Sequence, residues 1–119
     1  MADNKDVMQT CQLINFDKAT IYLHEELMIT PDPATLLVEG VVNSLGVNVA
    51  LHQSGIEVSG ADAWYIYEIV ACGMWSAIGT KTYSASAILP SQKDTKGIKL
   101  RGADGQISEL LWSNANQFS

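Results

Sequence analysis

The sequence predicts an all-β protein, an antiparallel β-sandwich or a small β-barrel of about seven to eight strands. Three observations support this fold class. Apolar residues recur with period two, glycine-containing turns interrupt them at short intervals, and the 119 residues, 47% of them hydrophobic, suffice for one core. We therefore expect a single domain over residues 11–113, with a flexible N-terminal tail at 1–10 and a C-terminal tail at 114–119.

The first segment, residues 13–30, is compatible with two structures. It can form two strands that turn near Asp17-Lys18, or one short N-terminal helix that begins at Asp17, because its apolar residues satisfy both periods. Pro31-Asp32-Pro33 ends either element, since proline disfavours helical backbone in the residue before it. The choice between strand and helix stays open here.

The next predicted strand covers Ala34 to Val42. Small and branched apolar residues occupy every second position, and Thr35, Leu37, Glu39 and Val41 lie between them. Because both faces contain apolar residues, we expect this strand to be mostly buried on both sides.

A β-hairpin is predicted around Ser54-Gly55 as a two-residue loop. The two arms of this hairpin match on both faces, which makes the register internally consistent. The predicted cross-strand pairs are Leu51 with Val58, Gln53 with Ile56, His52 with Glu57, and Ala50 with Ser59.

Residues 64–77 are rich in aromatic and β-branched side chains, which favours a long strand. A tight turn at Ile78-Gly79 would then return the chain along Lys81 to Leu89, up to Pro90, which cannot donate to a ladder. In this second hairpin Glu68 faces Leu89, on a side that resembles core.

A third hairpin is predicted over residues 97–112, around Ala103-Asp104-Gly105. A three-residue loop with Gly105 in the left-handed conformation places apolar opposite apolar and basic opposite acidic. The predicted pairs are Ile98 with Leu110, Leu100 with Ser108, and Lys99 with Glu109.

Charge limits the classes of partner. The net charge is -6, which argues against nonspecific binding to nucleic acid or to an anionic membrane. The longest weakly charged stretch, residues 63–79, contains Glu68 and is shorter than the roughly 20 apolar residues that a membrane helix needs. We therefore expect neither a nucleic-acid partner nor a membrane span.

Cys11 and Cys72 are the two cysteines of the chain. The polar N-terminus lacks the pattern of a secretion signal, so we expect a cytoplasmic protein in which both thiols are reduced. Neither a CxxC pair nor a cluster of cysteine and histidine is present. No metal site and no other cofactor are therefore expected.

Six residues, all in the predicted second hairpin, are candidates for ligand binding. An aromatic wall beside small residues can accept a sugar ring, a lipid chain or a partner strand, although aromatics also pack between sheets. A carboxylate on a face that resembles core is a further candidate, with an ion pair to Lys81 or Arg101 as the structural alternative. The candidates are Trp64, Tyr65, Tyr67, Glu68, Trp75 and Tyr83.

Each of the two histidines is expected to lie near a carboxylate. His52 opposite Glu57 resembles a general base with an orienting carboxylate, and His24 beside Glu26 resembles part of a metal site. No GxSxG motif supplies a nucleophile, and no third metal ligand follows at a fixed spacing. Solvated polar pairs are the better interpretation, so no catalytic residue is assigned.

These observations favour a non-enzymatic interaction protein that self-associates as a homo-oligomer, or binds a partner protein, through an apolar, aromatic-bearing sheet face. One alternative is a β-barrel or sandwich that binds a small sugar or apolar ligand. Another is a small enzyme that uses Glu68 or His52 as acid or base. The biological process and the identity of a ligand stay open.

Overall fold

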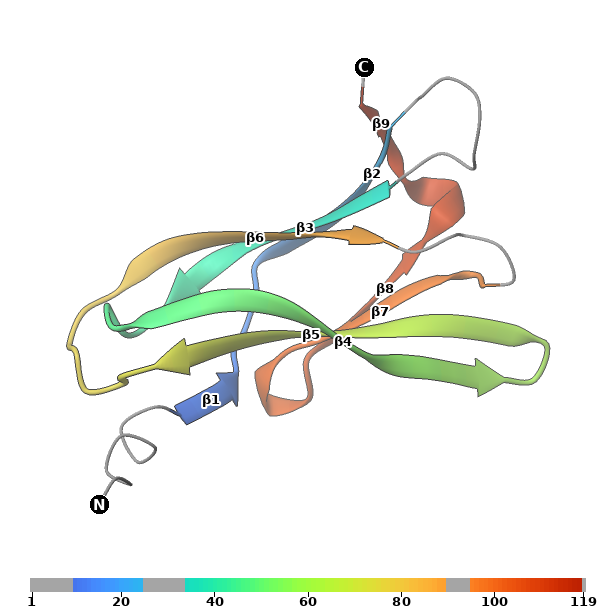
Figure 1. Ribbon diagram of the computed structural model, residues 1–119. Helices are drawn as coiled ribbons and strands as arrows, with labels where there is room; N and C mark the ends of the chain where they lie inside the picture. The colour runs from blue at the N-terminus through green and yellow to red at the C-terminus, as the bar shows by residue number, and fades with distance from the viewer. Residues whose placement is uncertain (1–9, 25–33, 90–94, 119) are drawn as a thin grey trace.

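The computed structural model describes residues 10–24, 34–89 and 95–118. These residues form two β-sheets that pack face to face (Figure 1), so the all-β prediction is confirmed. The two sheets are separate and make a sandwich rather than a closed barrel. Seven strands have five residues or more, and two shorter strands, β1 and β9, complete the sheets.

The first sheet, sheet A, is built around β5. β5 pairs with β4 along its whole length, with β1 at its C-terminal end and with β7 in parallel at its N-terminal half, while β8 pairs with β7. Its strands are β1 (Thr10–Leu13), β4 (Val47–Ser59), β5 (Asp62–Gly73), β7 (Gly97–Arg101) and β8 (Ile107–Leu111).

The second sheet, sheet B, is built around β3. β3 pairs antiparallel with β2 and β6, and β9 pairs in parallel with the end of β2. Its strands are β2 (Lys18–His24), β3 (Ala34–Val42), β6 (Lys81–Leu89) and β9 (Asn116–Phe118). The predicted C-terminal tail therefore contributes a strand to this sheet.

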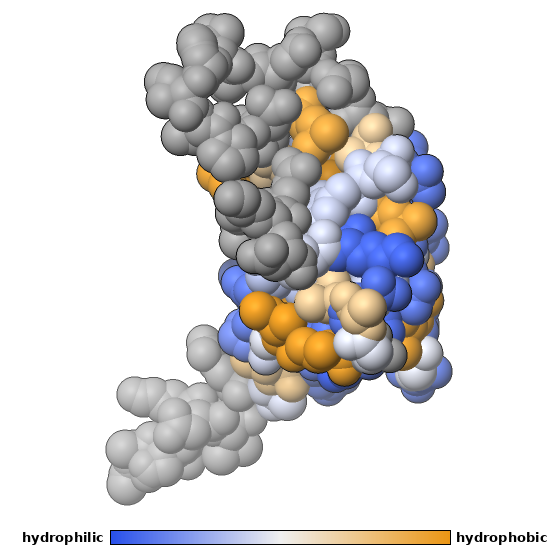
Figure 2. Space-filling model, turned by 90° about the vertical axis from the view of Figure 1, so that its right-hand side faces the viewer, coloured by the Kyte–Doolittle hydropathy of each residue, from blue (hydrophilic) through white to orange (hydrophobic). Residues whose placement is uncertain are grey.

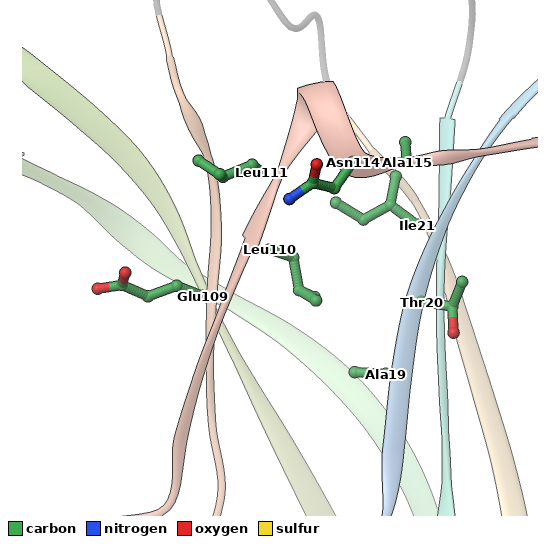
Figure 3. Close-up of a pocket in the computed structure, with 8 residues that line it drawn as sticks. All are labelled: Ala19, Thr20, Ile21, Glu109, Leu110, Leu111, Asn114 and Ala115. Carbon is green, nitrogen blue, oxygen red and sulfur yellow. The ribbon is translucent and has the colours of Figure 1, made fainter.

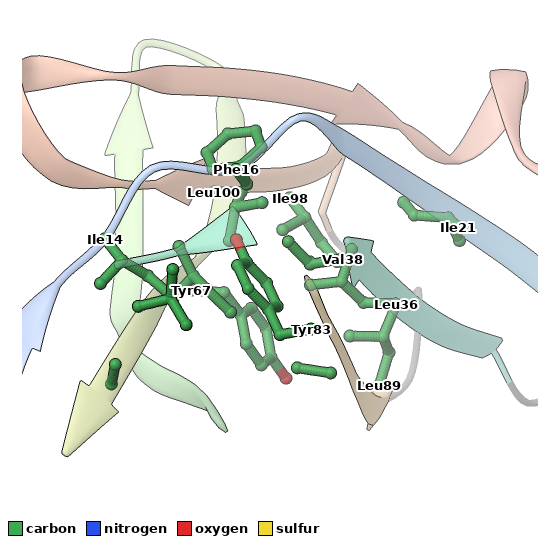
Figure 4. Close-up of a cluster of buried hydrophobic side chains, with 14 of the residues drawn as sticks. Ile14, Phe16, Ile21, Leu36, Val38, Tyr67, Tyr83, Leu89, Ile98 and Leu100 are labelled. Carbon is green, nitrogen blue, oxygen red and sulfur yellow. The ribbon is translucent and has the colours of Figure 1, made fainter. Parts of the chain in front are cut away.

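The core lies between the sheets and is filled by alternate residues of their facing strands (Figure 4). In β3 the buried set includes Leu36 and Val38, both without exposed surface, whereas the intervening residues are partly or fully exposed. The expectation that β3 is mostly buried on both sides holds for the inner face, whereas the second face is only partly buried and Val41 on it is exposed. Its second face is the outer face of the sandwich, since no further layer covers sheet B in the described part of the chain.

The hairpin predicted around Ser54-Gly55 is wrong. β4 runs straight through these residues as one strand, with a β-bulge between Gln53 and Gly55, and the chain turns at Gly60-Ala61 instead. Gly60 has a φ of 63°, the left-handed conformation that this turn requires. Backbone pairing of β4 with β5 continues past the expected loop, because β5 lies beside β4 as far as Asp62.

The hairpin predicted between residues 64–77 and β6 is also wrong. β5 ends at Gly73, and β6 crosses to sheet B, where it pairs with β3 along its whole length. The connection is held at the end of the sandwich by Leu45, whose amide donates to the Ala77 carbonyl at 3.1 Å. Two strands that are adjacent in sequence therefore face each other across the core.

The first segment forms strands, and no helix longer than a 3₁₀ turn occurs in the described residues. β1 and β2 lie in different sheets, so they are not a hairpin. Ile14 and Phe16 are buried where the chain crosses between the sheets. Residues 25–33, which include Pro31-Asp32-Pro33, lie outside the described residues.

The third predicted hairpin is confirmed with its register. Ile98 pairs with Leu110 and Lys99 with Glu109 across β7 and β8. The loop has Gly105 at a φ of 78°, as expected, and Asp104 at 56°. Local turn chemistry and cross-strand charge were sufficient here because both strands belong to one sheet.

Cys11 and Cys72 form a disulfide, so the expectation of two reduced thiols is wrong. They lie directly opposite each other in the antiparallel pairing of β1 with β5. The pairing of strands so distant in sequence is what brings the two thiols together.

Among the described residues, no helix is long and apolar enough to cross a bilayer.

Candidate functional site

Tyr67 and Tyr83 of the predicted aromatic surface lie in the core. Figure 4 shows their rings among the buried aliphatic side chains between the two sheets. The Tyr83 hydroxyl donates to the Asn15 carbonyl at 2.7 Å. Burial, with a smaller contribution from the charge of Asp17, raises the pKa of Tyr83 to about 12. Burial also raises the pKa of Tyr67 above its ordinary value.

The other aromatic candidates are distributed over different parts of sheet A. Trp64 is buried on the outer face of sheet A, on the opposite side of β5 from its neighbour Tyr65 and from Tyr67. Tyr65 packs against the core. The Trp75 indole donates to the Thr10 carbonyl at 2.9 Å, beyond the other end of β5. The structure therefore brings no shared aromatic face together from these residues.

A charged layer covers Trp64 on the outer face of sheet A. Lys99 Nζ lies 5.3 Å from the ring centroid, 3.3 Å from a Glu57 oxygen and 3.6 Å from a Glu109 oxygen. The Lys99 side chain is only 18% exposed, which strengthens these contacts relative to those of a fully solvated lysine. Lys99 therefore contacts two carboxylates and the Trp64 ring within the chain.

Glu68 also lies on this outer face and not against Leu89. It is adjacent to Arg101 in the parallel pairing of β5 with β7, and its carboxylate lies 3.8 Å from the guanidinium. The ion pair with Arg101 that the sequence suggested is therefore present. Such a pair at partly exposed side chains is an ordinary structural contact.

The histidine pairs do not assemble a chemical site in the described residues. His52 is exposed and lies opposite Glu68 in β4 and β5, while Glu57 lies opposite Trp64. The predicted pairing of His52 with Glu57 within the chain is therefore wrong. His24 ends β2, but Glu26 lies outside the described residues. No group of three possible metal ligands occurs in the part that the structure describes.

A pocket of about 270 Å³ lies between the edges of the two sheets (Figure 3). β2 and β8 form its walls, with the turn after β8 at one end. Its lining is aliphatic and polar and contains no aromatic ring. The lining residues are Ala19, Thr20, Ile21, Glu109, Leu110, Leu111, Asn114 and Ala115.

The distal part of the β4–β5 hairpin, residues 53–65, exposes apolar side chains. Ile56 is 57% exposed and Val58 is 70% exposed. Both lie on the same face of β4 as the residues that pack against the core farther along the strand. Figure 2 looks onto the end of the molecule at which this hairpin projects and shows hydrophobic residues gathered at the surface. A second exposed apolar group lies at the opposite end, where Leu45 is 53% and Ile78 is 92% exposed.

The outer edge of β4 is the second feature of this hairpin. Within residues 10–24, 34–89 and 95–118, β4 pairs with β5 alone. Lys81 Nζ donates to the Val47 carbonyl at 2.7 Å and so occupies the first part of the edge. The remaining part of this strand of 13 residues presents unpaired backbone groups beside Ile56 and Val58.

The exposed hairpin and the unpaired edge of β4 were not predicted, because the sequence suggested a turn at Ser54-Gly55. Both arms of the supposed hairpin are in fact one edge strand, whose alternation was the correct signal. Comparison of the chain with protein-family models, curated proteins and solved structures finds no match. The structural class is an all-β sandwich, and the function has to be argued from its surface.

Proposed function

We propose that this chain is a non-enzymatic interaction domain that binds protein through the distal β4–β5 hairpin. The observation that carries the proposal is the exposure of Ile56 and Val58 beside an unpaired strand edge. Apolar side chains and free backbone groups together are what strand-addition interfaces use for affinity. The surface differs from the aromatic-bearing face expected from the sequence, since the hairpin contributes aliphatic side chains.

The ligand-binding alternative has weaker support. The aromatic rings that would contact a sugar or apolar ligand, Tyr67 and Tyr83, are packed in the core. The pocket between β2 and β8 has no aromatic lining. A more open pocket beside β3 and β6, of about 470 Å³, is lined by Tyr83, but this side chain is only 9% exposed. The enzymatic alternative also has weaker support, because the predicted pair of His52 with Glu57 is not formed within the chain and Glu68 is in an ion pair with Arg101.

The disulfide bears on where the domain works. Cys11 and Cys72 are joined, and such bonds persist in oxidising compartments rather than in a reducing cytoplasm. We therefore favour a non-reducing compartment over the cytoplasmic location that the sequence suggested.

The proposed function can be tested with the double substitution Ile56→Lys and Val58→Lys. Two lysines on the exposed hairpin should abolish association, because pairing would desolvate two charges. Ile78→Lys, at a side chain 92% exposed at the other end, is the matched control. Native mass spectrometry of tagged protein expressed in its own source compares the copies or partners retained by the three proteins.

Association that is lost in the hairpin variant and kept in the Ile78 variant supports the proposal. Association that is unchanged by both lysines overturns it. Circular dichroism confirms that each variant is folded before the comparison is made.

A further inference from the structure

Hydrogen-bonding groups alternate along the unpaired edge of β4. The Met74 amide donates to the Gly46 carbonyl at 3.0 Å, so Gly46 points toward β5 and Val47 points away from it. Along β4, including the part after the bulge, the N–H and C=O groups of every second residue therefore point away from β5. The outward N–H and C=O groups after Val47 belong to Val49, Leu51, Gln53, Ile56 and Val58.

The open part of β4, residues 50–59, matches itself when it is reversed about Ser54-Gly55. Reversal pairs Leu51 with Val58, Gln53 with Ile56, His52 with Glu57, and Ala50 with Ser59. This pattern imitates a hairpin, but one chain does not use it, because β4 is continuous. Antiparallel pairing of two β4 strands about a two-fold axis at Ser54-Gly55 restores all four pairs.

The β-bulge makes this register compatible with the faces of the sheet. Leu51 and Val58 are separated by an odd number of positions, so a regular strand would place them on opposite faces. The shift between Gln53 and Gly55 corrects this. Leu51 lies opposite Ile69 and Val58 opposite Ala63, which are on the same face of β5.

The same register satisfies the backbone. Leu51 and Val58 both turn their N–H and C=O groups outward, and so do Gln53 and Ile56. Pairing across the axis therefore joins donors to acceptors at each of these positions. A register displaced by one residue would oppose outward groups to inward ones.

Charge complements the same arrangement. His52 of one copy lies beside Glu57 of the other, in a non-hydrogen-bonded pair where side chains approach most closely. Glu57 contacts Lys99 through one carboxylate oxygen at 3.3 Å, and a carboxylate has a second oxygen that can accept from His52 of the other copy. Two-fold symmetry forms the contact twice.

We propose that two copies of this chain associate by antiparallel pairing of their β4 strands, centred on Ser54-Gly55, so that their A sheets form one continuous sheet. This inference rests on the proposed function and names its partner as a second copy. A strand edge is a small contact by the standard of stable interfaces, so the dimer dissociates on dilution.

Sedimentation of the purified, oxidised protein over a concentration series is the first measurement. The wild type should approach twice the chain mass of 12.9 kDa as concentration rises. His52→Glu places like charges together twice and should weaken dimerisation at least about tenfold. His52→Gln, which adds no charge, should weaken it much less, and Ile88→Lys on the outer face of β6 should leave it unchanged.

Cysteine trapping tests the register. In the double variant His52→Cys and Glu57→Cys, each new thiol lies opposite its counterpart in the second copy, so mild oxidation should yield a covalent dimer. The two thiols of one chain are about 16 Å apart along the strand and cannot join to each other. The control Ala50→Cys with Glu57→Cys is out of register and should crosslink poorly.

Two results overturn the inference and leave the proposed function standing. One is a dimer that His52→Glu does not weaken and that the register-matched cysteines do not trap, because the copies would then meet elsewhere. The other is a monomer at every concentration up to about 1 mM that still loses a different partner in the lysine variant of the hairpin. A monomer that retains no partner in any form overturns both.

Discussion

The Tyr83 hydroxyl is an example of how one buried residue links distant parts of the chain. It donates to the Asn15 carbonyl in the segment that crosses between the sheets, while its ring packs in the core. Its ionised form would be poorly solvated in this position, which is why burial raises its pKa. Ionisation of Tyr83 is therefore expected to lower the stability of the fold.

We expect Tyr83→Phe to lower the free energy of unfolding at neutral pH by about 1 kcal/mol, through loss of the hydrogen bond. The folded pKa of about 12 exceeds the ordinary value of 10.0, so the wild type loses stability as pH rises through this window. The phenylalanine variant lacks this group. Denaturant unfolding should show the same gap between the two proteins at pH 7 and pH 9 and a smaller or reversed gap at pH 11. A gap that is unchanged at pH 11 would contradict the assignment.

Lys99 stabilises the outer face of sheet A through two carboxylates and the Trp64 ring. Lys99→Met keeps the aliphatic stem and removes the charge, so we expect a loss of about 1 kcal/mol that shrinks in high salt. Lys96→Met is the matched control, because Lys96 and Asp62 are each about half exposed. Chemical unfolding at low and high salt measures both; an equal cost for the two variants would argue against a special role for Lys99.

At the scale of single elements, β7 and β8 approach closely at Gly97. A Cβ there would overlap the Leu110 carbonyl and lie 2.9 Å from the Leu111 Cα. Gly97→Ala should therefore cost about 2 kcal/mol or more, because backbone atoms cannot move aside cheaply.

Gly105→Asn is the control for this prediction. Gly105 has a φ of 78° with no atom within 4 Å of a Cβ, and asparagine tolerates this conformation well. We expect it to cost less than about 1 kcal/mol in the same thermal or chemical unfolding experiment. The close contact would be the wrong explanation if both substitutions were equally tolerated.

The disulfide joins β1 covalently to β5, and all four residues of β1 are exposed. Cys11→Ser with Cys72→Ser should lower stability by about 2–4 kcal/mol, since a cross-link over 61 residues no longer restricts the unfolded chain.

The same variant should expose residues 10–13 to rapid hydrogen exchange. Ile14 and Phe16 should keep their protection, because both are buried beyond the end of β1. Exchange mass spectrometry distinguishes this local release from loss of the whole sheet. Unchanged protection of β1 would show that its pairing with β5 is sufficient without the bond.

Most strand segments could be predicted from the sequence, but β4 was divided at Ser54-Gly55 and β9 was expected as a tail. Among the pairings of strands adjacent in sequence, that of β7 with β8 was predicted and that of β4 with β5 was missed. The register of β7 with β8 followed from Gly105 and from Lys99 opposite Glu109. The partner of β6 could not be inferred, because β6 leaves sheet A and pairs with β3, from which it is separated by two strands. Alternation shows which residues share a face and does not show which sheet a strand joins.

At the scale of the whole molecule, the same limit explains why the candidate site changed. Tyr67 and Tyr83 were expected in one hairpin as contacts of a ligand, but the crossing of β6 places them in opposite layers that meet in the core. Cys11 and Cys72 were expected to be reduced because the sequence suggested a cytoplasmic protein. Their pairing depends instead on β1 lying beside β5. Non-local pairings of this kind carry no short-range signal.

The bond between Cys11 and Cys72 also determines how the domain would respond to a mechanical load between its two ends. Tension would pass from residue 11 directly to residue 72, so the loop that the bond closes, which contains β2, β3 and β4, would be shielded from extension. Apart from the residues before Cys11, only the chain after Cys72 could be drawn out, to about 16 nm at roughly 3.4 Å per residue. Reduction would release the rest, which makes the attainable length of the stretched domain depend on the redox state of its surroundings.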